Sequence, residues 1–148
     1  LRALSHHELL IHFSRPYMDD PSALGVPYRD FAIDDAGKVA DGVAVQRGTV
    51  QEAYTKVLAD LDQAEQLLGT TGRPFRATRG AAIALKTRVK LHMGDWAGVL
   101  TEYAKIASTY QLTASVEGPF GAGTSTENIF SLQHSNVSNP GVNGALSR

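Results

Sequence analysis

The residues with the greatest capacity for chemistry stand early in the chain, in the segment HHELLIH at positions 6–12. Two histidines four residues apart on a helix, with a glutamate between them, form the zinc site of many metalloproteases. His7 and His12 are instead five residues apart, which places them about 140° apart around a helix, so a regular helix cannot direct both at one ion. We therefore expect no metal site here, and we interpret His6 and His7 as surface or partly buried structural residues.

Two further polar segments resemble binding motifs only in part. The glycine-rich segment GPFGAGTS at 118–125 lacks the lysine of a phosphate-binding loop, and its surroundings show no strand-loop-helix pattern. The aspartate pairs at 19–20 and 34–35 lack the alternating spacing of an EF-hand, so we expect them in solvated turns. Nor does the sequence place a pair of facing carboxyl groups or a nucleophile with its base. It therefore predicts no catalytic residue, no metal and no cofactor.

Aromatic and arginine side chains between positions 16 and 48 are the remaining candidates for a binding site. Tyr17, Tyr28, Arg29 and Phe31 lie in a stretch that holds three prolines, several glycines and clustered aspartates. Exposed aromatic faces beside hydrogen-bonding groups hold sugars and other flat, partly apolar ligands. These four residues are therefore the predicted ligand contacts. The alternative interpretation is that the same aromatic rings pack this segment against the helices.

The composition excludes several broad classes of function. A formal net charge of -1 gives no general attraction to nucleic acid or to an anionic membrane surface. No apolar run is long enough to span a bilayer, and the absence of cysteine excludes disulfides and thiolate metal sites. A chain of 148 residues is expected to form a single domain. Because it begins inside a helix-like run without a methionine, we interpret it as a portion of a longer protein.

The segments that must position these residues are mainly predicted to be helical, because their apolar residues recur every three or four positions. Apolar spacing predicts helices over about 1–15, 49–68, 78–93 and 95–110, with loops over 16–48 and 113–148. Thr49 and Glu52 fit a capping box, Gly94 suits the left-handed position after a helix, and Asp95 suits the next cap. Residues 129–133 are compatible with a short extended segment. The predicted fold is all-α, with tetratricopeptide-like helical hairpins and long irregular loops.

Four aromatic residues repeat at the spacing of a helical core. Trp96, Tyr103, Tyr110 and Tyr54 each fall on an apolar helical stripe, and we expect them to be buried. If the Trp96 ring is fully buried, Trp96→Ala should cost about 3–5 kcal/mol of stability.

The order of the segments resembles the SusD/RagB family of outer-membrane, glycan-binding lipoproteins of Bacteroidetes. The likeness rests on five stretches: LRALSHHELLIHFSRPY at 1–17, GVPY at 25–28, RGTVQEAYTKVLADLDQAEQLL at 47–68, the hairpin at 79–112, and ENIFSLQHS at 127–135. The chain departs from the family in its first helix, where His6 and His7 replace the usual aromatics and Pro16-Tyr17 replaces a common glycine. Family members are also several times longer and carry a lipidated amino-terminal cysteine.

The resemblance implies a SusD-like fold and a function in nutrient uptake. Proteins of this family bind oligosaccharide or polysaccharide at the bacterial cell surface without hydrolysing it and deliver it to a TonB-dependent, SusC-like transporter. The implied location is the outer membrane, through a lipid anchor that this chain does not contain. Sugar contacts in the family come from variable loops, so none is transferred to this chain. The alternative is a helical-repeat scaffold that binds a protein partner without glycan specificity.

Overall fold

The computed structural model describes residues 1–70, 72–120 and 125–132. Its elements in chain order are α1 (Arg2–Phe13), β1 (Leu24–Pro27), α2 (Lys38–Ala44), β2 (Arg47–Thr49), α3 (Val50–Leu67), α4 (Arg79–Met93), α5 (Trp96–Ala104) and the 3-10 turn η1 (Gly118–Phe120). The described part of the chain is rich in helix and holds one two-stranded sheet, which confirms the predicted all-α class. In these residues no helix is both long and apolar enough to cross a membrane.

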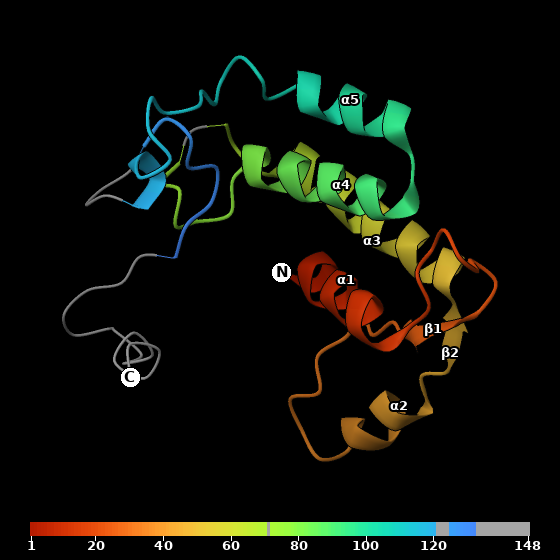
Figure 1. Ribbon diagram of the computed structural model, residues 1–148. Coiled ribbons are helices and arrows are strands. Elements are labelled where there is room, and N and C mark those ends of the chain that lie inside the picture. The colour runs from red at the N-terminus through yellow and green to blue at the C-terminus, as the bar shows by residue number, and fades with distance from the viewer. Residues whose placement is uncertain (71, 121–124, 133–148) are drawn as a thin grey trace, which may run out of the picture.

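The four longer helices follow one another across the molecule (Figure 1). α3 packs on both α1 and α4, and α4 packs in turn on α5, which forms the outer edge. The core lies between α1, α3 and α4, where the side chains of Leu10, Val57 and Val89 are fully buried. Burial of such aliphatic side chains is the main source of stability in this layer.

Local signals in the sequence fix where the helices begin and end. Thr49 Oγ1 accepts a hydrogen bond from the Glu52 N–H at 3.1 Å, and Glu52 Oε2 accepts one from the Thr49 N–H at 2.9 Å, so the predicted capping box is confirmed. Gly94 ends α4 with a φ of 74°, the left-handed conformation that favours glycine. Asp95 then caps α5, so two residues join the hairpin as predicted.

Two of the predicted helices are longer than the observed ones. The helix predicted over 1–15 is α1, Arg2–Phe13, and the helix predicted over 95–110 ends at Ala104. Beyond Ala104, the N–H groups of Lys105 and Ile106 bond to carbonyls three residues back, at 3.1 and 3.0 Å. Such bonds tighten the turn and end the α-helix.

The segment 16–48, predicted as a loop, contains regular structure. β1 pairs with β2 in antiparallel register, with Leu24 opposite Thr49, and α2 lies between the strands in sequence. The two backbones come so close that a Cβ on Gly25 would lie 2.8 Å from the Thr49 carbonyl oxygen. Pairing between residues twenty or more positions apart leaves no local period to detect, and α2 is only seven residues long. The loop prediction was therefore wrong at these three elements.

Of the second predicted loop, 113–148, the structure describes residues 113–120 and 125–132. Residues 118–120 form the short turn η1. The extended segment suggested at 129–133 does not form a strand over 129–132, and residue 133 lies outside the described residues.

Of the four aromatic residues expected to be buried, the prediction is confirmed for Tyr54, met only in part by Tyr110, and wrong for Trp96 and Tyr103. Tyr54 is buried in α3 and Tyr110 is half-buried against Gly80, whereas Trp96 and Tyr103 are 59% and 57% exposed. α5 directs a charged residue, Glu102, toward α4 and turns its aromatic side outward. The large cost expected for Trp96→Ala therefore does not apply to this arrangement of helices.

Candidate functional site

Three of the four predicted ligand contacts lie together directly after β1, and the fourth follows α1. Tyr17 packs edge-on against Tyr54 of α3, with ring centroids 5.1 Å apart and an interplanar angle of 68°. Tyr17 and Tyr28 are both partly buried and pack against the hydrophobic core. For these two tyrosines, the structure supports the interpretation that they hold the segment against the helices.

Tyr28 is the best-anchored of the four residues. Its ring stacks on His6 of α1, with centroids 3.9 Å apart and an interplanar angle of 22°, and Lys56 Nζ lies 5.6 Å from the ring centroid. The Tyr28 hydroxyl donates to Asp60 Oδ2 at 2.6 Å. Burial, followed by this hydrogen bond, raises the pKa of Tyr28. One face of the ring is thus already occupied by a protein side chain.

Asp60 joins Tyr28 to the start of α1. Arg2 donates to both carboxylate oxygens of Asp60, with Nε 2.6 Å from Oδ2. The hydrogen bond from Arg2 holds the pKa of Asp60 below its usual range, and the bond from Tyr28 adds to the effect. Because the carboxylate stays ionised, it acts as a fixed acceptor that ties α1 and the segment after β1 to α3.

Arg29 and Phe31 are the members of the predicted set that solvent reaches most freely. Arg29 Nε donates to the carbonyl of Gly42 in α2 at 2.9 Å, and the Arg29 backbone N–H donates to His6 Nε2 at 3.1 Å. Arg29 as a whole is nevertheless exposed, and Phe31 is 40% exposed. An exposed ring beside a cation that can donate hydrogen bonds is compatible with a flat polar ligand. The ligand-binding role of the four residues stays a prediction.

His7 is a structural histidine, and it is fully buried where α1 meets α3 and α4. Its ring lies edge-on to Tyr54 and to His92, with centroids 5.8 and 5.1 Å away, and neither ring nitrogen has a hydrogen-bond partner in the described residues. Burial is the main cause that lowers the pKa of His7 to about 4; the charges of His92 and Arg88 add to the lowering, and Glu8 opposes it. The ring is therefore neutral near pH 7. Over the described residues, no group of three or more potential ligands is arranged to hold a metal ion.

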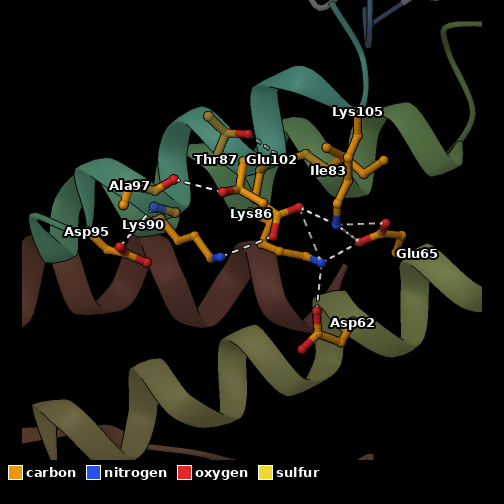
Figure 2. A network of polar contacts seen from close by, with 12 residues as sticks. Asp62, Glu65, Ile83, Lys86, Thr87, Lys90, Asp95, Ala97, Glu102 and Lys105 are labelled. Atoms are coloured by element: carbon orange, nitrogen blue, oxygen red, sulfur yellow. Dashed lines mark hydrogen bonds and ion pairs between the residues drawn. The ribbon is translucent and has the colours of Figure 1, made fainter.

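A network of charged side chains, centred on the buried Lys86 and Glu102, joins α3, α4 and α5 (Figure 2). Lys86 of α4 is almost fully buried and forms ion pairs with Asp62 at 2.6 Å, with Glu65, and with Glu102 at 3.7 Å. Glu102 of α5 is equally buried and also meets Lys105 at 2.7 Å. These contacts join α4 to α3 on one side and to α5 on the other. Lys90 adds a hydrogen bond to Glu102 at 3.1 Å, and Lys105 adds one to Glu65 at 3.1 Å.

The ionisation of these groups argues against acid–base chemistry in the network. The hydrogen bond from Lys86 leads the effects that lower the pKa of Glu65. For Glu102, burial opposes ionisation, but hydrogen bonds from Lys105 and Lys90 outweigh it and the pKa is lowered. A glycosidase needs one carboxyl group with a raised pKa to protonate the leaving group. Neither carboxylate has that property, so the network is better suited to holding helices together.

Sequence reasoning missed this network. Lys86 and Glu102 stand on different helices, and their partners on α3 are more than twenty residues away from Lys86. The available signal was a lysine in the middle of the small, aliphatic residues of α4, because a lysine at such a position is buried only when it is paired.

An apolar groove of about 580 Å³ lies between the start of α1, the second half of α3 and the first half of α4. Its lining is mostly leucine and alanine, and Phe130 is the one aromatic ring among the described residues that line it. Sugar sites usually combine aromatic faces with several hydrogen-bonding groups. The groove therefore does not have the composition expected of a glycan site.

The fold and part of the sequence are similar to known proteins. Residues 1–91 match a family described as "Starch-binding associating with outer membrane". A solved structure of a candidate sugar-binding protein from Bacteroides vulgatus is 27% identical, with a TM-score of 0.78, over 95% of this chain and 33% of that one. A SusD superfamily protein from Bacteroides fragilis is 31% identical, with a TM-score of 0.78, over 93% of this chain and 32% of that one.

A third solved structure is also similar to this chain. This SusD superfamily protein from Bacteroides thetaiotaomicron is 28% identical, with a TM-score of 0.64, over 76% of this chain and 24% of that one. The chain thus spans about a third of the length of the first two solved relatives. No curated protein matches the chain.

Proposed function

Because this chain belongs to the SusD-like family, we propose that the protein binds oligosaccharide or polysaccharide at the bacterial cell surface and delivers it to a TonB-dependent, SusC-like transporter. The observation that carries the proposal is the match of residues 1–91 to a family described as starch-binding and associating with the outer membrane. The similar fold of the candidate sugar-binding protein from Bacteroides vulgatus supports it. Attachment to the outer membrane would be through a lipid anchor outside this chain.

Within this chain, we place the glycan contacts on the segment that follows β1. Phe31 is an exposed aromatic residue there, and Arg29, which is also exposed, has further N–H groups that can donate hydrogen bonds to sugar hydroxyls. Tyr28 holds this segment against α3 through Asp60, while Tyr17 packs on Tyr54 of the same helix. The helices would then act as a scaffold that fixes the position of a small binding surface.

We further propose that binding leaves the glycan intact. Glycoside hydrolysis requires two carboxyl groups at a defined separation, one of them protonated at working pH. Asp60, Glu65 and Glu102 are instead held ionised by arginine or lysine partners. These paired carboxylates serve structure in the described part of the chain, and transport would proceed without cleavage by this protein.

Affinity electrophoresis of the full-length protein on a panel of polysaccharides, starch among them, tests the proposal. We expect slower migration on at least one polysaccharide, with no release of reducing sugar when the same protein is incubated with it. Unchanged migration on every member of the panel would favour the alternative of a helical scaffold without glycan specificity. Release of reducing sugar would overturn the proposal that binding is non-catalytic.

A further inference from the structure

His6 of α1 contacts the segment that carries the proposed glycan contacts. It is buried, with 8% of its surface exposed, and its ring stacks on Tyr28. Its Nδ1 lies 2.9 Å from the carbonyl oxygen of Arg2, and its Nε2 lies 3.1 Å from the backbone nitrogen of Arg29. Each ring nitrogen therefore has a partner, one on α1 and the other on the segment after β1.

These two partners determine which form of the His6 ring the structure contains. A carbonyl oxygen only accepts hydrogen bonds, so Nδ1 must carry a proton and donate it to the Arg2 carbonyl. A backbone N–H only donates, so Nε2 must be unprotonated and accept from Arg29. The ring is therefore neutral, and a single tautomer satisfies both contacts.

A proton on Nε2 would remove the contact between His6 and Arg29. In a protonated ring both nitrogens are donors, so the Nε2 proton would face the Arg29 N–H with no acceptor between them. A buried donor without an acceptor is costly, and the backbone at Arg29 would therefore move away from the ring. An unperturbed imidazole takes up its second proton near pH 6.5, so the change belongs to mildly acidic conditions.

The charged groups around the stacked His6 and Tyr28 rings do not restore this contact. They are Arg2 from α1, Lys56 and Asp60 from α3, and Arg29 and Asp30 from the segment after β1. A positive charge on His6 adds to the lowering of the Asp60 pKa, so Asp60 would attract a protonated ring. That attraction supplies no acceptor to the Arg29 N–H, and Asp60 is already bonded to Arg2 and Tyr28.

We propose that His6 is a positioning residue that holds the backbone at Arg29 while its ring is neutral and releases Arg29 and Phe31 when the ring is protonated, so that glycan binding weakens as the pH falls. The effect on the backbone follows from the two hydrogen bonds, whereas the effect on affinity rests on the proposed function. Tyr28 stays anchored to Asp60 through its hydroxyl group, so the expected release is local.

Amide hydrogen exchange in the full-length protein tests the effect on the backbone. Exchange of the Arg29 N–H would be followed at pH 7.5 and pH 5.5 by mass spectrometry of overlapping peptides, with each rate divided by the intrinsic rate at that pH. We expect the protection of this N–H to fall about fivefold or more at pH 5.5. Unchanged protection in the wild-type protein would overturn the inference.

Three variants assign the pH dependence to His6. His6→Phe keeps an aromatic ring but has no acceptor, so the Arg29 N–H should be weakly protected at both pH values. His6→Gln keeps an acceptor that does not titrate, so protection should be retained at both. His12→Gln, at an exposed position of the same helix, should behave like the wild type. All three variants keep His7, so pH-dependent protection in either His6 variant would overturn the inference.

Isothermal titration calorimetry at the same two pH values tests the effect on affinity. The probe is a polysaccharide that slows the protein in affinity electrophoresis, starch being the first tested. We expect the wild-type protein to bind about fivefold or more weakly at pH 5.5 and His6→Gln to bind equally at both pH values. Equal wild-type affinities would overturn the inference. If no polysaccharide binds, the proposed function fails, and exchange of the Arg29 N–H by itself decides the role of His6.

Discussion

The interface between α1, α3 and α4 and the interface between α4 and α5 are built from opposite kinds of side chain. The first buries Leu10, Val57 and Val89, which are aliphatic and make no directional bonds. The second buries Lys86 and Glu102, each surrounded by charges of opposite sign. Apolar contacts tolerate many relative orientations of two helices, whereas an ion pair and its hydrogen bonds are satisfied by few. The comparison indicates that the core supplies stability and the charge network sets the orientation of α5.

The largest expected effect is at the charged interface. Lys86→Met removes the almost fully buried cation that pairs with both Glu65 and Glu102 and leaves them only their less buried partners, such as Lys105, so we expect it to lower the free energy of unfolding by about 3–5 kcal/mol. Urea unfolding of the full-length protein measures this change. The control is Lys38→Met, because Lys38 forms an exposed ion pair with Asp34 that should contribute less than about 1 kcal/mol.

A double variant sharpens the same prediction. In Lys86→Met with Glu102→Gln, the buried carboxylate on α5 is neutralised together with its cation, so part of the lost stability should return. If the two substitutions have strictly additive effects, the proposed coupling between α4 and α5 through these charges is wrong.

A substitution in the apolar interface should lower the free energy of unfolding by a comparable amount. Leu10→Ala removes a fully buried side chain from α1 and should lower the free energy of unfolding by about 2–5 kcal/mol. Leu9→Ala is the matched control on the adjacent, exposed position, and it should cost less than about 1 kcal/mol. A similar loss in both variants, measured by urea unfolding, would mean that the core is not centred where α1 meets α3.

The buried His7 gives the apolar interface a dependence on pH. Its pKa is lowered from 6.5 to about 4 in the folded protein, so the unfolded chain binds the proton more readily between these values. Stability is fully present above about pH 6.5 and is lost as the pH falls toward 4, by about 3 kcal/mol in total. Urea unfolding between pH 4 and pH 7 measures this change.

The His7 contribution can be separated from that of the other titrating groups. His7→Phe should flatten the pH dependence over this window, while His12→Phe, at an exposed position of the same helix, should leave it unchanged. An unaltered pH profile in His7→Phe would contradict the assignment.

Much of the fold could be predicted from local patterns in the sequence. α3 and α4 follow from apolar periodicity with Thr49, Thr78 and Gly94 as end signals, and the structure confirms them within a residue or two. β1 and β2 could not be predicted, because pairing between distant backbones leaves no periodic signal in strands of three and four residues. Trp96 was misplaced because periodicity identifies an apolar side of a helix but not which neighbour covers it.

The candidate site was predicted less completely than the fold. The sequence drew attention to Tyr28, and the structure explains its position through His6 and Asp60. No spacing rule connects Asp60 to Tyr28 or Lys86 to Glu102, since each pair is brought together by the packing of separate elements. Local sequence patterns therefore identified candidate binding residues such as Tyr28. They could not predict which side chains these residues contact, because those contacts depend on how the helices pack.

The smallest expected effect bears most directly on the proposal that this protein binds glycan through the segment after β1. Isothermal titration calorimetry would compare the full-length wild-type protein, Phe31→Ala and Phe120→Ala against a polysaccharide that slows its migration in affinity electrophoresis. Phe120 is an exposed phenylalanine elsewhere on the molecule and serves as the control. We predict that Phe31→Ala weakens binding about tenfold through loss of an aromatic contact, with an unchanged melting temperature, and that Phe120→Ala binds like the wild type. Equal affinity of all three proteins would contradict the proposed binding surface, and the absence of binding by the wild-type protein would contradict the proposed function itself.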